Sequence, residues 1–322
     1  MKYSFDGKTL ILFSSDGLCY FLRENGISRD DFNLPVVIAD TVKNCNCLLS
    51  ECYSFNSSVT IPDSVVSCED MFYSCHNFNQ PVTIPSSVTD CSSMFADCVK
   101  FNQKIEIPNS VKTCTNMFHH CTSFNQPIKI PDSVTSCDFM FSYCIKFNQQ
   151  VDIPDSVIEC KHMFTSCYAF NQPVTISKNV TNCSDMFAYC KQFNQLVVIP
   201  PKVHSCHSMF EGCKQFNQSV VVPNSVMNCS YMFRGCTSLD SEITIPEGVI
   251  VLAYMFYNCH VFNQQVVIPS SVKDCSCMFW NCYKLDKKIE IPVGNIYIDE
   301  MFHGCSLLEK QYPELIQRCS LL

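Results

Sequence analysis

Residues 75–98 read CHNFNQPVTIPSSVTDCSSMFADC, and this stretch decides the fold. Blocks of the same pattern recur at a fixed spacing of 23 residues, twelve times and without an insertion or a deletion. A Met-Phe dipeptide marks the blocks from Met71 to Met301, and Leu48 holds the same position one block earlier. A fixed period of about 20–29 residues is typical of solenoids, in which each unit buries its apolar face by stacking on its neighbours.

One block contains the signals of a short strand, a turn and a return segment. Val82 and Ile84 alternate with Thr83, as in a strand with one buried face. Pro85 ends this strand because proline lacks the donor that the ladder needs. From Val88 onward, apolar residues recur at spacings of three, three, one and three, close to helical or 3₁₀ spacing. The sequence therefore predicts an α/β repeat solenoid of twelve coils, with a parallel β-sheet on one face and short helical or 3₁₀ returns on the other.

The blocks divide the 322-residue chain into one long domain with two flanks. We expect the solenoid to occupy residues 33–309, an N-terminal cap to occupy residues 1–32, and a C-terminal cap to occupy residues 310–322. Such caps shield the end coils of a solenoid from solvent. One elongated domain is therefore predicted, although the length alone would suggest two.

Both caps carry their own structural signals. Residues Tyr3 to Phe5 and Thr9 to Phe13 flank the turn-forming pair Asp6-Gly7, which predicts a pair of strands. The tail from Leu307 onward is predicted to form a terminal helix with Pro313 early in it.

Most of the 26 cysteines occupy two columns of the repeat. Leu252 and Ile298 replace cysteine in the first column, so we interpret it as apolar core, where a free cysteine behaves as a small hydrophobe. Buried, reduced thiols are predicted, with ladder disulfides between rungs ~4.8 Å apart as the alternative. The first column comprises Cys45, Cys68, Cys91, Cys114, Cys137, Cys160, Cys183, Cys206, Cys229 and Cys275. The second comprises Cys52, Cys75, Cys98, Cys121, Cys144, Cys167, Cys190, Cys213, Cys236, Cys259, Cys282 and Cys305.

Two further columns predict an aromatic stack and a polar ladder inside the repeat. Phe78 and its equivalents are expected to stack in the interior, with leucine at Leu239, Leu285 and Leu308. The asparagine that follows has both a donor and an acceptor, so it can satisfy backbone groups left open at a corner and link successive coils. The glutamine that usually comes next either extends the ladder or covers the corner. The structural ladder comprises Asn79, Asn102, Asn125, Asn148, Asn171, Asn194, Asn217 and Asn263, with Asp240 and Asp286 as replacements.

Composition and charge exclude several classes of protein. The net charge of −8 and the pI of about 5.4 disfavour a nucleic-acid-binding or anionic-membrane protein, which needs a basic face. No stretch is long enough to span a bilayer, and the apolar run near the N-terminus is too short and too interrupted for a signal peptide. These features predict no export signal and a cytoplasmic or intracellular protein. The reduced thiols fit a reducing compartment. A location at the cell surface or in a virion is the alternative.

The repeat carries no motif for catalysis or for a cofactor. It lacks a phosphate-binding glycine loop, a G-x-S-x-G elbow and an H-E-x-x-H helix, and the chain has eight glycines in all. The strict period leaves no inserted loop of the kind in which active sites usually lie. Histidines and cysteines cluster at residues 114–121 and 204–213, but without the C-x-x-C spacing of a zinc site. We therefore predict a protein that is not an enzyme and binds no metal or cofactor.

The pattern M-F-x-x-C-x-x-F-N-Q-x-V-x-I-P-x-S-V-x-x-C resembles the BspA-like (Treponema-pallidum-type) leucine-rich repeats and related repeats of bacterial surface proteins. Phe124 to Pro127 and Ile130 to Val134 are also similar to the FNIP-type repeats of amoebae and large viruses. The resemblance implies a leucine-rich-repeat-like, right-handed superhelix whose concave sheet binds proteins, often in adhesion. The chain departs from the adhesin pattern by its cysteines, which replace the usual Ile or Ala.

Candidate binding residues lie in the outward columns of the predicted strands. Glu106, Lys129 and Asp152 alternate in sign, so they are placed to pair across rungs. The valines farther along would be exposed, and exposed apolar residues on a concave sheet indicate a contact surface, although valine also suits strands wherever it lies. The outward candidates are Thr83, Glu106, Lys129, Asp152, Thr175, Leu196, Val198, Val221 and Val267.

The two variable positions inside M-F-x-x-C form a second candidate surface. Tyr257 and Trp280 lie there, and aromatic side chains are favoured in interfaces. The alternative is that these rings pack over neighbouring coils.

Together these features predict a non-enzymatic recognition module that displays a rigid surface to another protein. A rigid surface loses little ordering entropy on binding. An architectural subunit of a virion or large assembly is one alternative, and a cell-surface adhesin that binds a host protein or glycan is another. We expect a protein partner, with a glycan as the second option, no nucleic acid and no membrane insertion.

Overall fold

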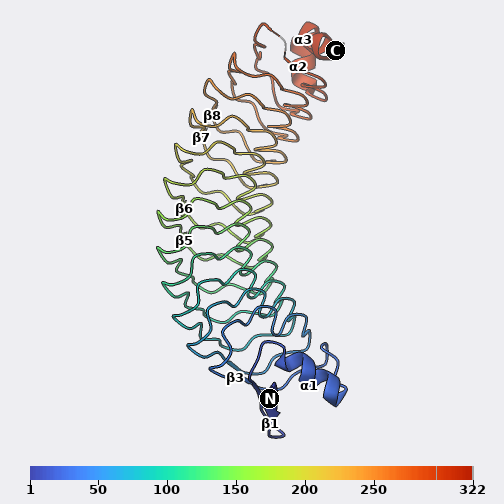
Figure 1. The fold of residues 1–322 in the computed structure, drawn as a ribbon. Coiled ribbons are helices and arrows are strands. Elements are labelled where there is room, and N and C mark those ends of the chain that lie inside the picture. Colours follow the sequence, from blue (N-terminus) through green and yellow to red (C-terminus); the bar gives the residue numbers. More distant parts are fainter. Residues whose placement is uncertain (295, 321–322) are drawn as a thin grey trace. The chain divides into compact units, whose positions relative to one another are not determined.

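A computed structural model describes residues 1–294 and 296–320 and divides the chain into two compact units, Met1–Val157 and Ile158–Leu322. Within each unit, coils of 23 residues stack on one another (Figure 1). The predicted repeat solenoid is therefore confirmed. The predicted boundaries after residues 32 and 309 stay predictions.

The first unit begins with a hairpin that continues into the coils. Strand β1 pairs antiparallel with β2, β2 pairs parallel with β3, and β3 pairs parallel with β4, in the order β1-β2-β3-β4. Leu10 lies opposite Val36, and Val36 lies opposite Val59. The predicted strand pair at the N-terminus is confirmed. The elements of this unit are β1 (Tyr3–Phe5), β2 (Leu10–Leu12), α1 (Gly17–Asn25), β3 (Val36–Ile38), β4 (Val59–Thr60) and β5 (Val151–Asp152).

Within its described residues, the second unit has three two-residue strands, and two short helices follow the last coil. Strand β7 pairs parallel with β8, with Val220 opposite Ile243. The tail forms two helices rather than one, because Pro313 cannot continue the first and instead begins the second. Residues 321–322, which were predicted to end the tail helix, lie outside the described residues. The elements are β6 (Val174–Thr175), β7 (Val220–Val221), β8 (Ile243–Thr244), α2 (Ser306–Gln311) and α3 (Pro313–Ser320).

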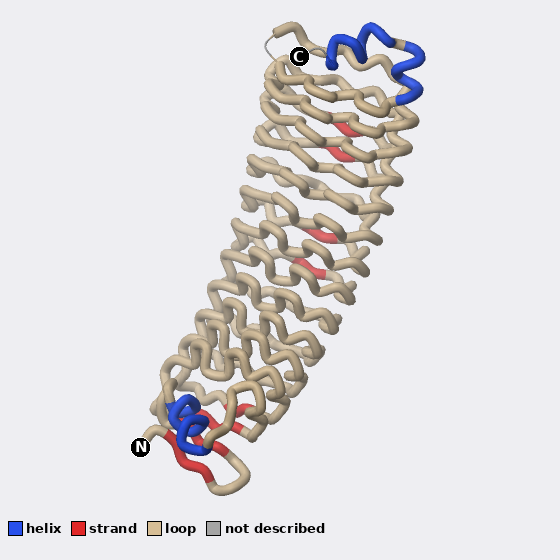
Figure 2. Tube along the Cα trace, turned by 90° about the vertical axis from the view of Figure 1, so that its right-hand side faces the viewer, coloured by secondary structure: helices blue, strands red, loops and turns tan. Residues whose placement is uncertain are grey.

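The prediction of a strand in every coil is wrong in its extent. Figure 2 shows few short strands, in red, among coils that are mostly loop and turn. The alternation of burial persists where no strand is formed: Val82 and Ile84 are buried while Thr83 is exposed. The proline that closes the segment supplies no ladder donor. Much of the pairing between coils shifts to the position before the first cysteine, where single parallel bridges join Ser67 to Asp90 and Asp90 to Thr113.

The predicted helical or 3₁₀ returns are also wrong. The return is a run of tight turns in which backbone donors alternate between two kinds of partner. Met71 N–H and Cys75 N–H donate to carbonyls three residues earlier, whereas Phe72 N–H donates to Met94 of the next coil at 3.0 Å. In a 3₁₀ helix every N–H would bond within its own turn. Here every second donor joins one coil to the next instead.

Two positions in each return adopt a left-handed backbone: the residue before methionine and the residue before the second cysteine. Asp70 has φ 52° and Ser74 has φ 58°, and Gly212 and Gly235 occupy the second position two coils in succession. A positive φ at the third residue of a tight turn defines the type II class and favours Gly, Asn or Asp. A 3₁₀ helix has negative φ throughout, so these residues exclude it.

Two parallel stacks of phenylalanine fill the core. The rings of Phe72 and Phe95 stack at 5.5 Å between centroids, those of Phe78 and Phe101 at 5.9 Å, and Phe95 meets Phe101 across the stacks at 4.3 Å. All are fully buried, and equivalent stacks run through the second unit. The predicted stack at the Phe78 column is confirmed, and the phenylalanine of the Met-Phe dipeptide forms a second one beside it.

Both cysteine columns lie in the same core. Every column member is buried, and no described cysteine forms a disulfide. In the second column, thiols donate to backbone carbonyls in the preceding coil, for example Cys98 to Phe72 at 3.1 Å and Cys213 to Phe187 at 3.0 Å. Burial raises the pKa of Cys45 and Cys229 to about 12. The thiols therefore act as small core side chains, as the sequence predicts.

We predict that Gly212→Ala destabilises the chain more than Gly235→Ala. Both positions have positive φ, so each alanine costs about 1–2 kcal/mol in backbone conformation. An alanine Cβ at position 212 would also lie 2.6 Å from Cδ1 of Tyr189, whereas at 235 the nearest atom is 3.8 Å away. We expect about 1–3 kcal/mol of additional loss at Gly212 from overpacking. Urea unfolding of both variants measures the difference, and equal losses would contradict the steric explanation.

We also predict that the chain unfolds in alkali well below pH 12. Buried thiols such as Cys229 keep their protons up to about pH 12, whereas thiols of the unfolded chain titrate near their usual 9.0. Between these values the folded state binds more protons, so the free energy of unfolding falls as pH rises, by up to about 1.4 kcal/mol per pH unit for each thiol. Below pH 9 this contribution is fully present. Circular dichroism and thiolate absorbance should change together.

Cys229→Val provides the control for the alkaline transition, because Leu252 shows that the column accepts an aliphatic side chain. The variant lacks one titrating thiol, so its unfolding midpoint should move to higher pH. A midpoint that stays in place would show that other groups drive the transition.

Candidate functional site

In the first unit, the outward strand column lies along shallow grooves between the rungs. Thr83, Glu106, Lys129 and Asp152 are all exposed, as the alternation predicts. Lys129 and Asp152 line one of these grooves together. Within the described residues, Glu106, Lys129 and Asp152 form no ion pair with one another, so the predicted pairing across rungs is wrong. An exposed ion pair contributes little free energy, because water competes for the charged groups and the long side chains lose conformational freedom.

The second unit carries an apolar stripe, which we define as Leu196, Val198, Val221 and Val267. Their exposed fractions are 62%, 76%, 70% and 75%. The valines are held outward because each follows an inward-facing, buried valine in its strand segment, at positions 197, 220 and 266. The outward Thr175 precedes the stripe, and a threonine at 244 interrupts it. The sequence predicted these exposures correctly from the alternation.

Polar residues border the apolar stripe on one side. The column of Leu196 continues with exposed Ser219, Glu242, Gln265 and Lys288. Gln265 Nε2 donates to the carbonyl of Lys288 at 3.0 Å, which holds that side chain against the next coil. An apolar centre with a polar border is the usual anatomy of a protein interface.

The second candidate surface is packed over its own coils. Tyr257 and Trp280 are half-buried in the return segments and stack at 5.7 Å, and Trp280 stacks on His303 at 3.9 Å. The guanidinium of Arg234 lies over the rings of Tyr231 and Tyr257 at 5.5 and 5.3 Å. Since the rings turn their faces to each other along the stack, they leave their edges to solvent. The structure therefore places Tyr257 and Trp280 in an intramolecular ladder.

A buried carboxylate network in the return segments was not predicted. Glu211 accepts hydrogen bonds from Tyr189 at 2.5 Å and Ser208 at 2.8 Å, and Arg234 lies 3.3 Å from it. Burial and the bond to Glu211 raise the pKa of Tyr189 to about 12. Burial also raises the pKa of Asp185, against the opposing charges of its histidine neighbours. The only sequence signal was Glu211 one period before Arg234. Each carboxylate oxygen of Glu211 already has a partner, so the network is structural.

The asparagine column forms a hydrogen-bonded ladder along the coils. The amide oxygen of Asn79 accepts the backbone N–H of Asn102 at 2.9 Å, and Asn102 in turn accepts from Asn125 at 2.9 Å. Gln103 Nε2 donates to the same oxygen of Asn79 at 3.1 Å, so the glutamine extends the ladder. In the second unit the carboxylate of Asp240 accepts the backbone N–H of Asn263 at 2.7 Å, and an aspartate therefore serves equally.

In the two histidine clusters, His120 and His207 contact side chains of neighbouring coils. His120 Nδ1 lies 2.5 Å from Asp97 Oδ1, and burial lowers the pKa of the adjacent His119. Among residues 1–294 and 296–320, no group of three or more His, Cys, Asp and Glu side chains is arranged to hold a metal ion. In the same part of the chain, no helix has the length and apolar character needed to cross a bilayer.

The chain matches a known family over most of its length. The family described as "Mycoplasma protein of unknown function, DUF285" matches in five overlapping segments, residues 32–130, 84–174, 115–221, 199–292 and 222–313. No curated protein is significantly similar to the chain.

Several solved structures are similar in fold. A leucine-rich repeat protein from Bacteroides ovatus aligns with a TM-score of 0.62 and 18% identity, over 89% of this chain and 83% of that chain. A leucine rich cell surface protein from Faecalibacterium prausnitzii aligns with a TM-score of 0.52 and 20% identity, over 96% of this chain and 85% of that chain. A leucine-rich repeat protein from Eubacterium ventriosum aligns with a TM-score of 0.51 and 16% identity, over 93% of this chain and 91% of that chain. At these identities the likeness shows the fold alone, which confirms the leucine-rich-repeat-type solenoid.

We predict that Asn102→Ala destabilises the chain, whereas Asn102→Asp is tolerated. The alanine leaves the backbone N–H of Asn125 and the amide of Gln126 without their shared acceptor, and an unsatisfied half-buried donor costs about 1–3 kcal/mol. The aspartate keeps the acceptor, as Asp240 does in its own coil. Urea unfolding compares the variants. An alanine variant as stable as the wild type would show that the ladder contributes nothing to stability.

Proposed function

The chain belongs to the DUF285 family, described as Mycoplasma proteins of unknown function, and from this premise we propose that it is a non-enzymatic recognition module that binds another protein. The fold of bacterial leucine-rich repeat proteins supports this, because stacked coils present a wide, preformed surface. We propose a closer likeness to BspA-like repeats on the Met-Phe and Phe-Asn-Gln motifs. The binding surface in this proposal is the apolar stripe of the second unit.

The exposure of the stripe is the observation that carries the proposal. Four aliphatic side chains, each more than 60% exposed, lie at outward positions in two neighbouring columns of the repeat. Contact with a partner would remove this area from water, at about 25 cal/mol for each Å². Contiguous apolar patches on a soluble surface mark interaction sites more often than isolated apolar residues do.

The surroundings of the stripe favour a protein as the ligand. A small molecule needs a concave pocket that covers most of its surface, and the stripe is carried by outward-pointing side chains. The net charge of −8 disfavours a nucleic acid. The backbone below the stripe is fixed by buried neighbours, so binding costs little conformational entropy there. Glu242 and Lys288 at the border supply charges for selecting a partner.

We predict that Val198→Lys, Val221→Lys and Val267→Lys combined weaken partner binding at least about 100-fold, which is about 2.7 kcal/mol. Three ammonium groups replace apolar contacts at the centre of the surface, while the buried neighbours keep the fold. The immobilised chain captures its partner from an extract of the source cells, mass spectrometry identifies it, and calorimetry with the purified partner gives the affinities.

A matched control carries three lysines in a different outward column, at Ile158, Met227 and Ile250, which are also exposed and apolar. This variant should bind like the wild type. If the stripe variant is folded by circular dichroism and captures the partner unchanged, the stripe is not the binding surface. Equal loss in both variants would point to a general charge effect.

A further inference from the structure

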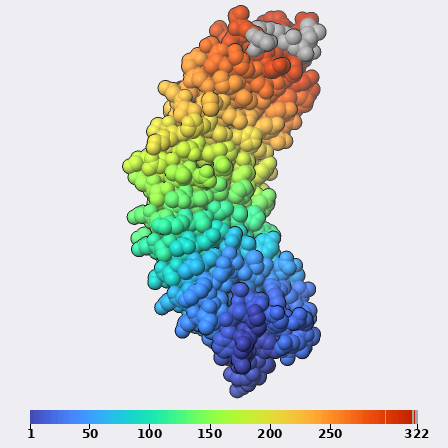
Figure 3. All heavy atoms as spheres, viewed as in Figure 1, coloured from blue at the N-terminus to red at the C-terminus, as the bar shows by residue number. Residues whose placement is uncertain are grey.

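Strand β1 forms an open edge of the N-terminal sheet. The carbonyl of Lys2 accepts Phe13 N–H at 3.0 Å, and Asp6 N–H donates to Thr9 at 3.5 Å, so the even-numbered residues face β2. Bonding direction alternates along an antiparallel strand, so the N–H and C=O groups of Tyr3 and Phe5 point to the other edge. No described strand pairs with that edge. In Figure 3 the first residues, in dark blue, lie at the surface of their unit.

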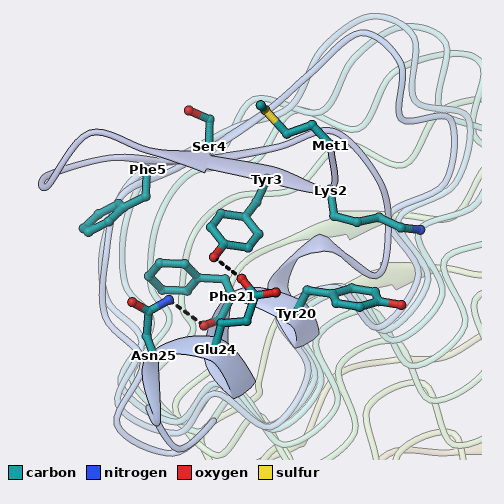
Figure 4. Close-up of a pocket in the computed structure, with 9 residues that line it drawn as sticks. All are labelled: Met1, Lys2, Tyr3, Ser4, Phe5, Tyr20, Phe21, Glu24 and Asn25. Carbon is teal, nitrogen blue, oxygen red and sulfur yellow. Dashed lines mark hydrogen bonds between the residues drawn. The ribbon is translucent and has the colours of Figure 1, made fainter.

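A groove with an aromatic floor lies between β1 and α1. Figure 4 shows Tyr3 and Phe5 directed toward the helix, where they meet Phe21 edge-on at 5.3 and 5.2 Å, while Ser4 points to the opposite side. Tyr20 and Glu24 of the helix also line the groove. Phe5 remains 39% exposed, although it lies against the ring of Phe21. The groove therefore offers backbone hydrogen bonds along one wall and apolar surface along its floor.

We propose that β1 pairs with β1 of a second copy of this chain, antiparallel and about a two-fold axis at Ser4. In this register Tyr3 of one copy lies opposite Phe5 of the other, and each pair exchanges two backbone hydrogen bonds. The rings of each pair lie on the same face, about 4.5–5.5 Å apart at Cβ, and cover one another. The two sheets then form one continuous sheet across the dimer.

The charges on β1 favour a second copy over another extended segment. The same register places Lys2 of each copy opposite Asp6 of the other, so two pairs of opposite charge form at the ends of the strand. Lys2 contacts Asp16 at 2.8 Å in an exposed pair, from which its ammonium can reach a second carboxylate at little cost. Ser4 meets its own equivalent in a non-hydrogen-bonded position, where the Cα atoms approach to about 4.5 Å and a small side chain fits.

The interface is short, so we expect a dimer that depends on protein concentration rather than a permanent one. It is independent of the apolar stripe, which lies in the second unit. The sheet edge also needs cover for a general reason, since open strand edges attract unwanted pairing partners.

Residue 4 provides the test, because only a two-fold axis brings it against itself. Ser4→Lys and Ser4→Glu each place like charges together and should raise the dimer dissociation constant at least about tenfold. An equimolar mixture of the two variants should restore the dimer, since lysine then faces glutamate. Sedimentation of the full chain over a range of concentrations measures this. Neither substitution removes a backbone bond to β2, and circular dichroism checks the fold.

Thr60→Lys is the matched control, because it adds the same charge to the same sheet face away from the open edge. It should dimerise like the wild type. A wild-type chain that remains monomeric at every concentration overturns the proposal. A dimer that persists in both Ser4 variants, or a mixture that does not recover, overturns it as well.

Discussion

The fixed coil length is the constraint on which the rest of the structure depends. Within each unit, buried backbone donors find their acceptors one coil away: Phe72 in Met94, Phe95 in Met117, and Phe210 in Met232. Buried backbone groups without partners are costly, so a coil one residue longer or shorter would leave a series of donors unpaired. The same register aligns the phenylalanine stacks and the asparagine ladder. The absence of any insertion in twelve blocks is therefore a consequence of hydrogen bonding, not only of packing.

Much of the fold could be predicted from the sequence, because equivalent positions of the repeats can be compared with one another. Burial of Val82 and Ile84 around an exposed Thr83 follows from alternation alone, and substitution of cysteine by Leu252 identifies a core column. The returns could not be predicted, since tight turns and 3₁₀ helices share the same three-residue bonding. What separates them is the positive φ at residues such as Tyr143, and the bonds to the neighbouring coil maintain it.

The candidate site also has features that the sequence predicts and features that it does not. The exposure of Val198, Val221 and Val267 follows from period-two alternation, so the sequence was sufficient to find the stripe. The network at Glu211 joins side chains from different coils, which meet only when the coils stack in register. A local sequence pattern therefore does not predict it. The stacking of Tyr257 on Trp280 was one of two possibilities left open by the sequence, and contact between coils decides between them.

The repeat also limits where function can reside. Each interior side chain touches its equivalents in the coils on either side, so a change there propagates along the stack and costs stability. Outward positions have no such neighbours to satisfy, and they are where threonine, valine and charged residues follow one another in a single column. A recognition surface of the kind we propose is therefore confined to the outward columns and the open edges of the sheets. The proposed apolar stripe lies in the outward columns and the proposed pairing edge is that of β1, and each exposes groups that the fold itself does not use.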